Sequence, residues 1–189
     1  VTLPKPGLSG MHQIDNASLA AAALIHVLGT NLDLTPDTII SGLGNAIWPG
    51  RIQKLDKGEL TALMPEQSIW LDGAHNAHGA KALVSALPDI HDGRWTVICG
   101  ALNTRNPDEF LAPISNIAGQ VHTLTIPDQP ASLTADDLSA SAKSMGLSAS
   151  PASSIQNALL KADNNHPVII CGSLYLAGHV LKENKTLPI

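Results

Sequence analysis

The sequence predicts an α/β protein with a mainly parallel sheet that is covered by helices on both faces. Short, almost entirely apolar runs recur along the chain, as in RWTVIC at 94–99 and VIIC at 168–171. Between such runs lie segments whose apolar residues recur at helical spacing, i, i+3, i+4 and i+7. Strands that are apolar on both faces are typical of parallel sheets buried between two helix layers. With right-handed crossovers, such a sheet is Rossmann-like.

The beginning of the chain has a different pattern and predicts helices alone. A first helix is expected from about Asp15 to Leu28, and Gly29 suits its C-terminal end. A second helix is expected with Thr35 as its N-cap and Pro36 at its first helical position. In the first helix one apolar face is formed by Ala17, Ala21, Leu24, Ile25 and Leu28. In the second helix the residues expected to face inward are Ile39, Ile40 and Leu43.

A boundary is expected next, because glycines and Pro49-Gly50 interrupt the chain. Residues 1–50 and 51–189 are therefore predicted to be separate parts. The expected strands cover residues 51–55, 59–64, 69–71, 94–99, 121–126 and 168–171. The expected helices of the second part begin near Asn76, Asn106, Thr134, Ser153 and Ser173, with Pro113 shortening the second of them.

The composition excludes several classes of function. The net charge is −5 and no cluster of Lys and Arg occurs, which argues against a nucleic-acid partner. No apolar run approaches the roughly 20 residues of a membrane span. The first residues lack a signal-peptide pattern, so a cytoplasmic protein is expected. Cys99 and Cys171 each end an apolar run, and buried free thiols are expected there.

The segment SIWLDGAHNAHGA at 68–80 carries the strongest chemical signal. An apolar strand breaks at Asp72-Gly73 and resumes as a helix, so Asp72 is a carboxylate acceptor at the ligand-binding end of a strand. His75 and Asn76 fall at the helix N-terminus, where free N–H groups and the helix dipole favour an anion such as phosphate. A plain turn, with Asn76 as N-cap and His75 as a surface histidine, is the alternative.

Three strands end in residues that can contact a ligand, namely Asp72-Gly73, Gly100-Ala101 and Gly172-Ser173. In a parallel sheet these ends lie along one edge. The chain has no GxxxxGK[ST] loop, no complete GxGxxG, no zinc motif and no GxSxG around Ser173. It therefore offers ligand contacts and no complete catalytic set.

Four segments in a fixed order resemble the C-terminal portion of a folylpolyglutamate synthase of the bifunctional dihydrofolate synthase type, in the Mur ligase superfamily. They are Gly10-Met11-His12-Gln13 with Asn16-Ala17, Pro49-Gly50-Arg51, Leu71-Asp72-Gly73-Ala74-His75-Asn76, and Gly172-Ser173-Leu174. The resemblance implies that 1–50 is the tail of a central ATPase domain and that 51–189 is the Rossmann-like C-terminal domain. It also implies a reaction in which ATP and Mg²⁺ activate a folate or dihydropteroate carboxylate for attack by the amine of L-glutamate.

The same resemblance implies a role for each of five residues. Asn16 corresponds to an adenine contact, and Arg51 to a hinge arginine that reaches the ribose or the phosphates. Asp72 corresponds to an acceptor for the ribose hydroxyls, and His75 to a catalytic histidine near the terminal phosphate. Ser173 corresponds to a contact of the incoming glutamate. The ordinary alternatives are helix capping by Asn16 and Ser173 and a solvated side chain for Arg51.

Two of the chain's departures from the family pattern bear on its function. The phosphate loop, the Mg²⁺ ligands and most of the folate pocket are absent from it, so the chain alone is expected to be inactive. The family often carries an acidic and basic pair such as Asp-Lys-Asp after the strand at 94–99. This chain has Leu102-Asn103-Thr104-Arg105-Asn106 there, and Arg105 is the one candidate to replace the charged residues of that pair. The expected partners are small molecules and the missing central domain. Another Mur-type ligase for a peptidoglycan precursor and a non-catalytic nucleotide-binding module are the rival interpretations.

Overall fold

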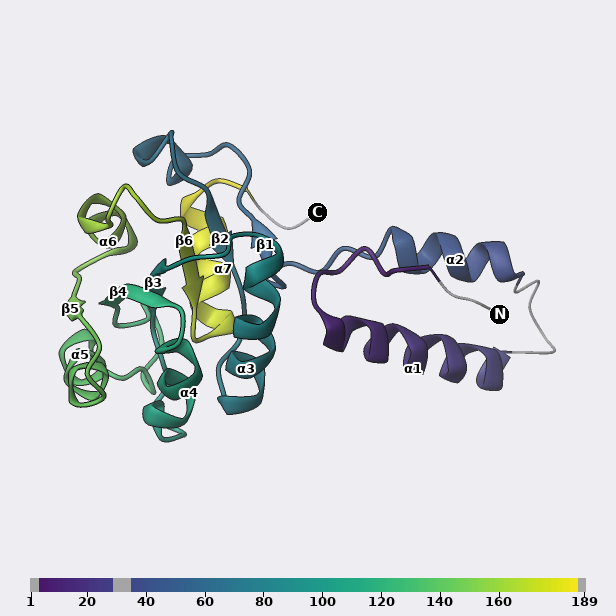
Figure 1. The fold of residues 1–189 in the computed structure, drawn as a ribbon, viewed down its shortest axis with the longest axis horizontal. Coiled ribbons are helices and arrows are strands. Elements are labelled where there is room, and N and C mark those ends of the chain that lie inside the picture. The colour runs from purple at the N-terminus through teal and green to yellow at the C-terminus, as the bar shows by residue number, and fades with distance from the viewer. Residues whose placement is uncertain (1–3, 29–34, 187–189) are drawn as a thin grey trace. The chain divides into compact units, whose positions relative to one another are not determined.

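A computed structural model describes residues 4–28 and 35–186, and the chain divides into two compact units, Val1–Pro49 and Gly50–Ile189. The first unit holds two helices, α1 (Met11–Leu28) and α2 (Pro36–Gly44), shown in Figure 1. Helix α1 begins four residues before the predicted start, because Gly10 adopts a φ of 107° and its carbonyl accepts the N–H of Gln13 at 2.9 Å. The predicted stop at Gly29 lies outside the described residues.

The helices of the first unit expose much of the apolar surface that the pattern assigned to a core. Thr35 caps α2 as predicted, its hydroxyl accepting the N–H of Thr38 at 3.2 Å. On the predicted apolar face of α1, Ala21 is buried, whereas Leu24 and Ile25 are 42% and 53% exposed. Helix α2 has no buried residue. Two short helices do not present enough surface to bury both apolar faces against each other.

The second unit is built on a six-stranded sheet in the order β1-β2-β6-β3-β4-β5. Strand β1 is antiparallel to β2, and all the other neighbours are parallel, which confirms the predicted mainly parallel sheet. The strands are β1 (Gln53–Lys54), β2 (Ile69–Leu71), β3 (Trp95–Cys99), β4 (Ala118–Thr123), β5 (Ala149–Pro151) and β6 (Val168–Cys171). The helices are α3 (Ala77–Ala86), α4 (Pro107–Ile114), α5 (Ala135–Ser144), α6 (Ile155–Lys161) and α7 (Leu174–Glu183).

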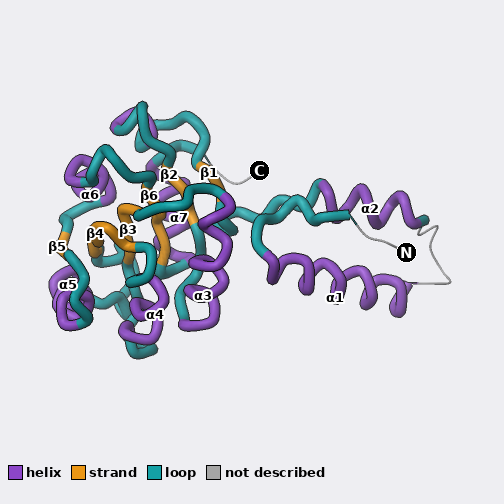
Figure 2. Tube along the Cα trace, viewed as in Figure 1, coloured by secondary structure: helices purple, strands orange, loops and turns teal. Residues whose placement is uncertain are grey.

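Helices cover both faces of this sheet, as Figure 2 shows. Helices α3, α4 and α5 pack on one face over a core that includes Trp95 and Leu111. Helices α6 and α7 pack on the other face over a core that includes Ile170 and Leu159. Strands β3 and β6 are buried along their whole length, which explains their almost entirely apolar sequences. Within 4–28 and 35–186, no helix combines the length and the apolarity that crossing a membrane requires.

The prediction of paired strands at residues 51–55 and 59–64 is wrong. Residues Thr61–Leu63 form a 3₁₀ turn, and β1 pairs with β2 instead. The cause lies at the far end of the chain, where the fully buried Asn184 accepts the N–H groups of Leu60 and Thr61 through Oδ1, at 2.9 and 3.2 Å. The hydrogen bonds of these two amides are therefore satisfied without pairing to another strand. Strand β5 was not predicted, since its short sequence lacks an apolar run.

The three strand ends singled out by the sequence do lie along one edge, because β6 sits between β2 and β3. Their backbones approach closely there. Gly172 adopts a φ of 103°, and a Cβ at this position would stand 2.4 Å from the carbonyl oxygen of Gly100. Glycine is thus required at the end of β6, and the carboxyl edge of the sheet is the place where a ligand site can form.

Candidate nucleotide and amino-acid site

The junction between β2 and α3 forms as the sequence predicted. The side-chain oxygen of Asn76 accepts the N–H of Gly79 at 2.8 Å, so Asn76 is the N-cap of α3. His75 precedes it and is exposed. The Nδ1 atom of His75 lies 2.9 Å from the carbonyl oxygen of Gly73, and a carbonyl can only accept. Nδ1 therefore carries the proton, and Nε2 is left for a ligand.

Asp72 is buried at this junction, with 6% of its surface exposed. Its Oδ1 atom accepts the N–H of Ala74 at 2.7 Å, and its Oδ2 atom accepts the N–H of Ile52 at 2.9 Å. Arg51, next to Ile52, is half-buried. The structure thus brings the segments of Arg51, Asp72 and His75 together, and Asp72 forms the link between them.

A small pocket of about 180 Å³ opens at the same edge of the sheet. This volume is below the roughly 300 Å³ at which pockets for drug-sized ligands begin, so the pocket suits a molecule no larger than an amino acid. The walls come from the β2–α3 junction, from the segment after β3 that leads into α4, and from the start of α7. They consist of His75, Ala101, Leu102, Thr104, Arg105, Asn106, Pro107, Phe110, Gly172, Ser173, Leu174 and Tyr175.

Ser173 is the N-cap that the alternative interpretation expected, and it also lines the pocket. Its backbone stands at the N-cap of α7, and its hydroxyl accepts the N–H of Tyr175 at 3.1 Å. The residue is only 3% exposed, yet it lines the pocket. The hydroxyl hydrogen can still be donated to a ligand, because capping uses the oxygen only as an acceptor.

The charge of the pocket is positive. Arg105 is exposed, and it supplies the single Lys or Arg side chain of the lining, which contains no Asp or Glu. The N-terminal ends of α4, capped by Asn106, and of α7, capped by Ser173, also meet the pocket. A guanidinium and two helix N-termini favour an anionic ligand such as a carboxylate.

Two lining residues were missed by the sequence analysis. Phe110 and Tyr175 are the one phenylalanine and the one tyrosine of the chain, and both line this pocket. Phe110 is 3% exposed, whereas Tyr175 is 57% exposed at the first turn of α7. Both residues are rare in the composition, but no local pattern linked them to the carboxyl edge of the sheet.

Asn16 lies on α1 in the first unit, whereas the other four predicted site residues belong to the second. Its side-chain Nδ2 donates to Oε1 of the buried Gln13 at 3.2 Å. It is exposed and lies within the helix, so it is not the N-cap that the alternative interpretation required. Within residues 4–28 and 35–186, no three His, Cys, Asp or Glu side chains come close enough to hold a metal ion.

The two cysteines lie side by side beneath the carboxyl edge, with Cys99 of β3 opposite Cys171 of β6. Both are free and buried, as predicted. Burial raises the pKa of Cys99 to about 12 and raises the pKa of Cys171 as well. A thiol acts as a nucleophile only as its thiolate, and burial disfavours that form at both positions.

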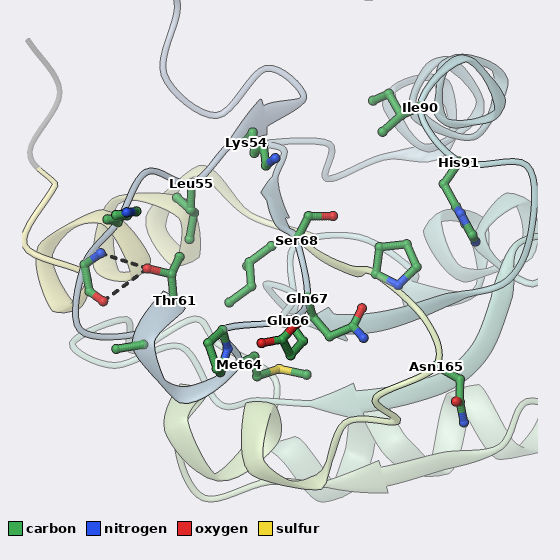
Figure 3. A pocket seen from close by; sticks show the side chains of 16 residues that line it. Lys54, Leu55, Thr61, Met64, Glu66, Gln67, Ser68, Ile90, His91 and Asn165 are labelled. Atoms are coloured by element: carbon green, nitrogen blue, oxygen red, sulfur yellow. Dashed lines mark hydrogen bonds between the residues drawn. The ribbon is translucent and has the colours of Figure 1, made fainter.

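A larger hollow of about 780 Å³ lies at the opposite, amino edge of the sheet (Figure 3). It is open to solvent and is lined by side chains such as Lys54, Glu66, Gln67 and His91. None of the predicted site residues reaches it. Ligands of parallel α/β sheets collect at the carboxyl edge, so the smaller pocket is the better candidate.

The fold and this edge define a Rossmann-like α/β domain with a candidate ligand site at the carboxyl end of its parallel strands. Residues 50–174 match the family model for the Mur ligase, glutamate ligase domain, and the chain belongs to this family. The folylpolyglutamate synthase resemblance drawn from the four motifs is confirmed by the curated relatives.

The chain is 28% identical over 184 residues to a dihydrofolate synthase/folylpolyglutamate synthase of Bacillus subtilis, covering 96% of this chain and 41% of the relative. It is 29% identical over 177 residues to a folylpolyglutamate synthase of Lacticaseibacillus casei, covering 92% of this chain and 38% of the relative. The structure of a Mycobacterium tuberculosis folylpolyglutamate synthase complexed with ADP matches this fold with a TM-score of 0.79 at 25% sequence identity. The match covers 96% of this chain and 41% of that structure. The chain therefore spans about two fifths of the length of these relatives.

Proposed function

We propose that this chain is the C-terminal part of an ATP-dependent ligase that joins L-glutamate to dihydropteroate or to a reduced folate. The observation that carries the proposal is the small cationic pocket beside the β2–α3 junction, which fits one amino acid next to an anion-binding helix N-terminus. The names of the relatives add the substrate class. Residues 1–50 would then be the tail of the central ATPase domain, and 51–189 the domain that closes over the nucleotide.

The proposed reaction has two steps. A carboxylate oxygen of the pterin substrate attacks the γ-phosphorus of ATP, which breaks the bond to the β-phosphate oxygen and releases ADP. The glutamate amine then attacks the acyl carbon of the resulting acyl phosphate, and phosphate departs with the electrons of the C–O bond. The amine proton passes to a base. Both steps develop charge on phosphate oxygens, which fixed donors stabilise.

Four residues of the chain are proposed to form the nucleotide contacts. Arg51 supplies a guanidinium fork that suits phosphate oxygens or the ribose. His75 acts as the catalytic residue, because its Nε2 atom, when protonated, donates toward the terminal phosphate while Nδ1 remains on Gly73. Asn16 contacts the adenine from the first unit. Asp72 belongs to the same wall of the site and is proposed to accept the ribose hydroxyls.

Glutamate is proposed to occupy the pocket itself. Its carboxylates would meet the Arg105 guanidinium and the hydroxyl of Ser173, while Phe110 and Tyr175 flank its aliphatic carbons. The amine would point toward His75, where the acyl phosphate forms. The Mg²⁺ that such a reaction uses would neutralise phosphate charge and would be held by residues outside this chain. The chain alone is accordingly proposed to be inactive, and the complete enzyme to be cytoplasmic.

The test uses the full-length gene product with ATP and L-glutamate, offered in turn dihydropteroate, tetrahydrofolate and a peptidoglycan precursor. ADP release that depends on a pterin substrate and on glutamate is expected. Turnover with the peptidoglycan precursor alone would assign a different Mur-type ligase. ATP binding without turnover on any substrate would favour a nucleotide-binding module. ATP-dependent ligation by the isolated 189 residues would contradict the proposed inactivity of this chain.

A further inference from the structure

Three buried polar side-chain atoms at neighbouring positions of the sheet lack a hydrogen-bond partner among the residues that the structure describes. They are Oγ1 of Thr96 in β3, and Oε1 of Gln120 and Nε2 of His122 in β4. Thr96 and His122 are 0% and 1% exposed, and Gln120 is partly buried. Buried polar atoms are nearly always hydrogen-bonded in folded proteins, because leaving one unpaired is costly. A cluster of three therefore points to a partner that all three share.

All three side chains lie on the face of the sheet that α6 and α7 cover. In the pairing of β3 with β4, Thr96 stands opposite Gln120, and Ile98 stands opposite His122. Ile98 belongs to the core beneath α6 and α7. Residues two apart in a strand share a face, and residues opposite each other in parallel strands do so as well. The three polar side chains therefore occupy adjoining positions on the same face.

The sheet is irregular at this place and leaves room between the strands. The pairing of β3 with β4 shifts between Trp95 and Thr96, so Gly119 is an extra residue in β4. Such a bulge disrupts the ladder locally and redirects the side chains beside it. Neighbouring strands lie about 4.8 Å apart, and a water molecule with two hydrogen bonds of about 2.8 Å spans this distance.

The chemistry of the cluster suits a neutral ligand that both donates and accepts hydrogen bonds. Oε1 of Gln120 only accepts, whereas the Thr96 hydroxyl can rotate to donate or accept. Nδ1 of His122 is 3.0 Å from the Ser150 hydroxyl, so Nε2 is the ring nitrogen left for this site. The positive charge of Lys161 lowers the pKa of His122, and the same charge disfavours a bound cation. Water fits these requirements.

We propose that this cluster is a binding site for one internal water molecule, which bridges Thr96, Gln120 and His122 beneath the helix layer. Buried water typically makes about three hydrogen bonds to groups that are otherwise unpaired, as it would here. The water thereby joins β3 to β4 where the bulge interrupts their backbone ladder. The site is separate from the carboxyl edge, so this inference does not depend on the proposed function.

Thr96→Val tests the site by the sign of its effect on stability. Valine keeps the shape of threonine without its hydroxyl, and removing an unpaired buried hydroxyl in this way would be neutral or stabilising. Because the hydroxyl binds the water, we expect Thr96→Val to raise the unfolding equilibrium constant of the full-length protein roughly fivefold in urea. A neutral or stabilising Thr96→Val would overturn the inference.

Ser139→Ala is the matched control. Oγ of Ser139 is also buried without a described partner, but it belongs to α5 on the opposite face of the sheet. Its removal should leave the unfolding equilibrium constant unchanged or lower it. Equal destabilisation by Ser139→Ala and Thr96→Val would show a general effect of hydroxyl removal and would contradict the shared site.

A double variant and a crystal structure test whether the water is shared. Thr96 and Gln120 do not bond to each other, so Thr96→Val and Gln120→Leu should combine less than additively because they disturb one water. A crystal structure of the full-length protein that resolves ordered solvent should show one water within hydrogen-bond distance of all three atoms. Strict additivity, or a Gln120 side chain bonded directly to Thr96 or His122 without water, would refute the proposal.

Discussion

The imidazole Nδ1 of His75 is 2.9 Å from the carbonyl oxygen of Gly73, and this contact fixes which ring nitrogen faces the ligand. We predict that His75→Ala in the full-length protein lowers kcat by about 10²–10³-fold, the cost typical of removing one donor to developing charge. The KM for ATP should change much less, since the interaction strengthens mainly in the transition state. Steady-state ADP release at saturating glutamate measures both quantities.

His78→Ala is the matched control for this prediction. His78 lies three residues further on, is exposed, and does not line the pocket. Its replacement should leave kcat within about twofold of the wild type. Equal losses in the two variants would show that the helix N-terminus, and not the His75 ring, is responsible.

Arg105 should control the affinity for glutamate. Because it is the one Lys or Arg side chain in the pocket lining, Arg105→Ala is predicted to raise the KM for glutamate roughly tenfold, in line with the loss of a hydrogen bond to a charged group. Arg105→Glu should raise it further, because a carboxylate then faces a carboxylate. The KM for ATP is the internal reference and should stay unchanged in both variants.

Lys81→Ala removes one positive charge from an exposed position on α3, away from the pocket lining. If it raises the glutamate KM as much as Arg105→Ala does, the effect is one of net charge alone. A glutamate KM that is unaffected by Arg105→Glu would mean that the amino acid binds elsewhere.

The sequence alone predicted most of the sheet, because the periodicity of a buried parallel strand is a local property. The caps at Asn76, Asn106 and Thr134 were likewise visible, since each needs only a side chain and an amide two or three residues ahead. The turn at Thr61–Leu63 was not predictable in this way, because it depends on Asn184 at the other end of the chain.

The same distinction applies to the site. The junction Asp72–Asn76 is one continuous motif and could be found by inspection. The hydrogen bond from the N–H of Ile52 to the carboxylate of Asp72 joins segments that are distant in the sequence. It depends on the positive φ of Ile52, which no residue pattern predicted. Tyr175 was missed because an exposed tyrosine in a helix has no periodic signal of its own.

Replacing Gly172 and Gly178 by alanine should have opposite effects on the free energy of unfolding, because only Gly172 lies in close contact with another backbone segment. Gly172→Ala should lower the free energy of unfolding by about 2 kcal/mol or more, because its Cβ would stand 2.4 Å from a backbone oxygen at a φ of 103°. Gly178→Ala should raise it by up to about 1 kcal/mol, since Gly178 lies in α7 with nothing within 4 Å of the new Cβ. Urea unfolding monitored by tryptophan fluorescence measures both.

Comparing Gly172→Ala with Gly178→Ala also distinguishes backbone strain from the effect of helix propensity on stability. If Gly172→Ala were as stable as the wild type, the close contact at the carboxyl edge would be absent in solution. A destabilised Gly178→Ala would indicate that this face of α7 is covered by a partner.

His122 should make the stability of the second unit fall as the pH becomes acidic. The side chain is 1% exposed between β4 and β5, with Nδ1 3.0 Å from the Ser150 hydroxyl. Burial lowers the pKa of His122 below its ordinary value, and the positive charge of Lys161 lowers it further. The unfolded chain binds its proton near the ordinary pKa of about 6.5, whereas the folded chain binds it only at lower pH. The unfolded state thus holds more protons in this interval, and stability is complete above about pH 6.5 and decreases below it.

The predicted slope attributable to His122 is at most about 1.4 kcal/mol per pH unit, between pH 6.5 and the lowered pKa of the folded state. His122→Gln keeps a polar group for Ser150 but cannot titrate, so the difference in unfolding free energy between wild type and variant should shrink toward acidic pH. His78→Gln, which removes an exposed histidine instead, should preserve the pH dependence of the wild type. Parallel pH profiles of wild type and His122→Gln would mean that His122 binds its proton equally well in the folded and the unfolded protein, and burial would then not control its titration.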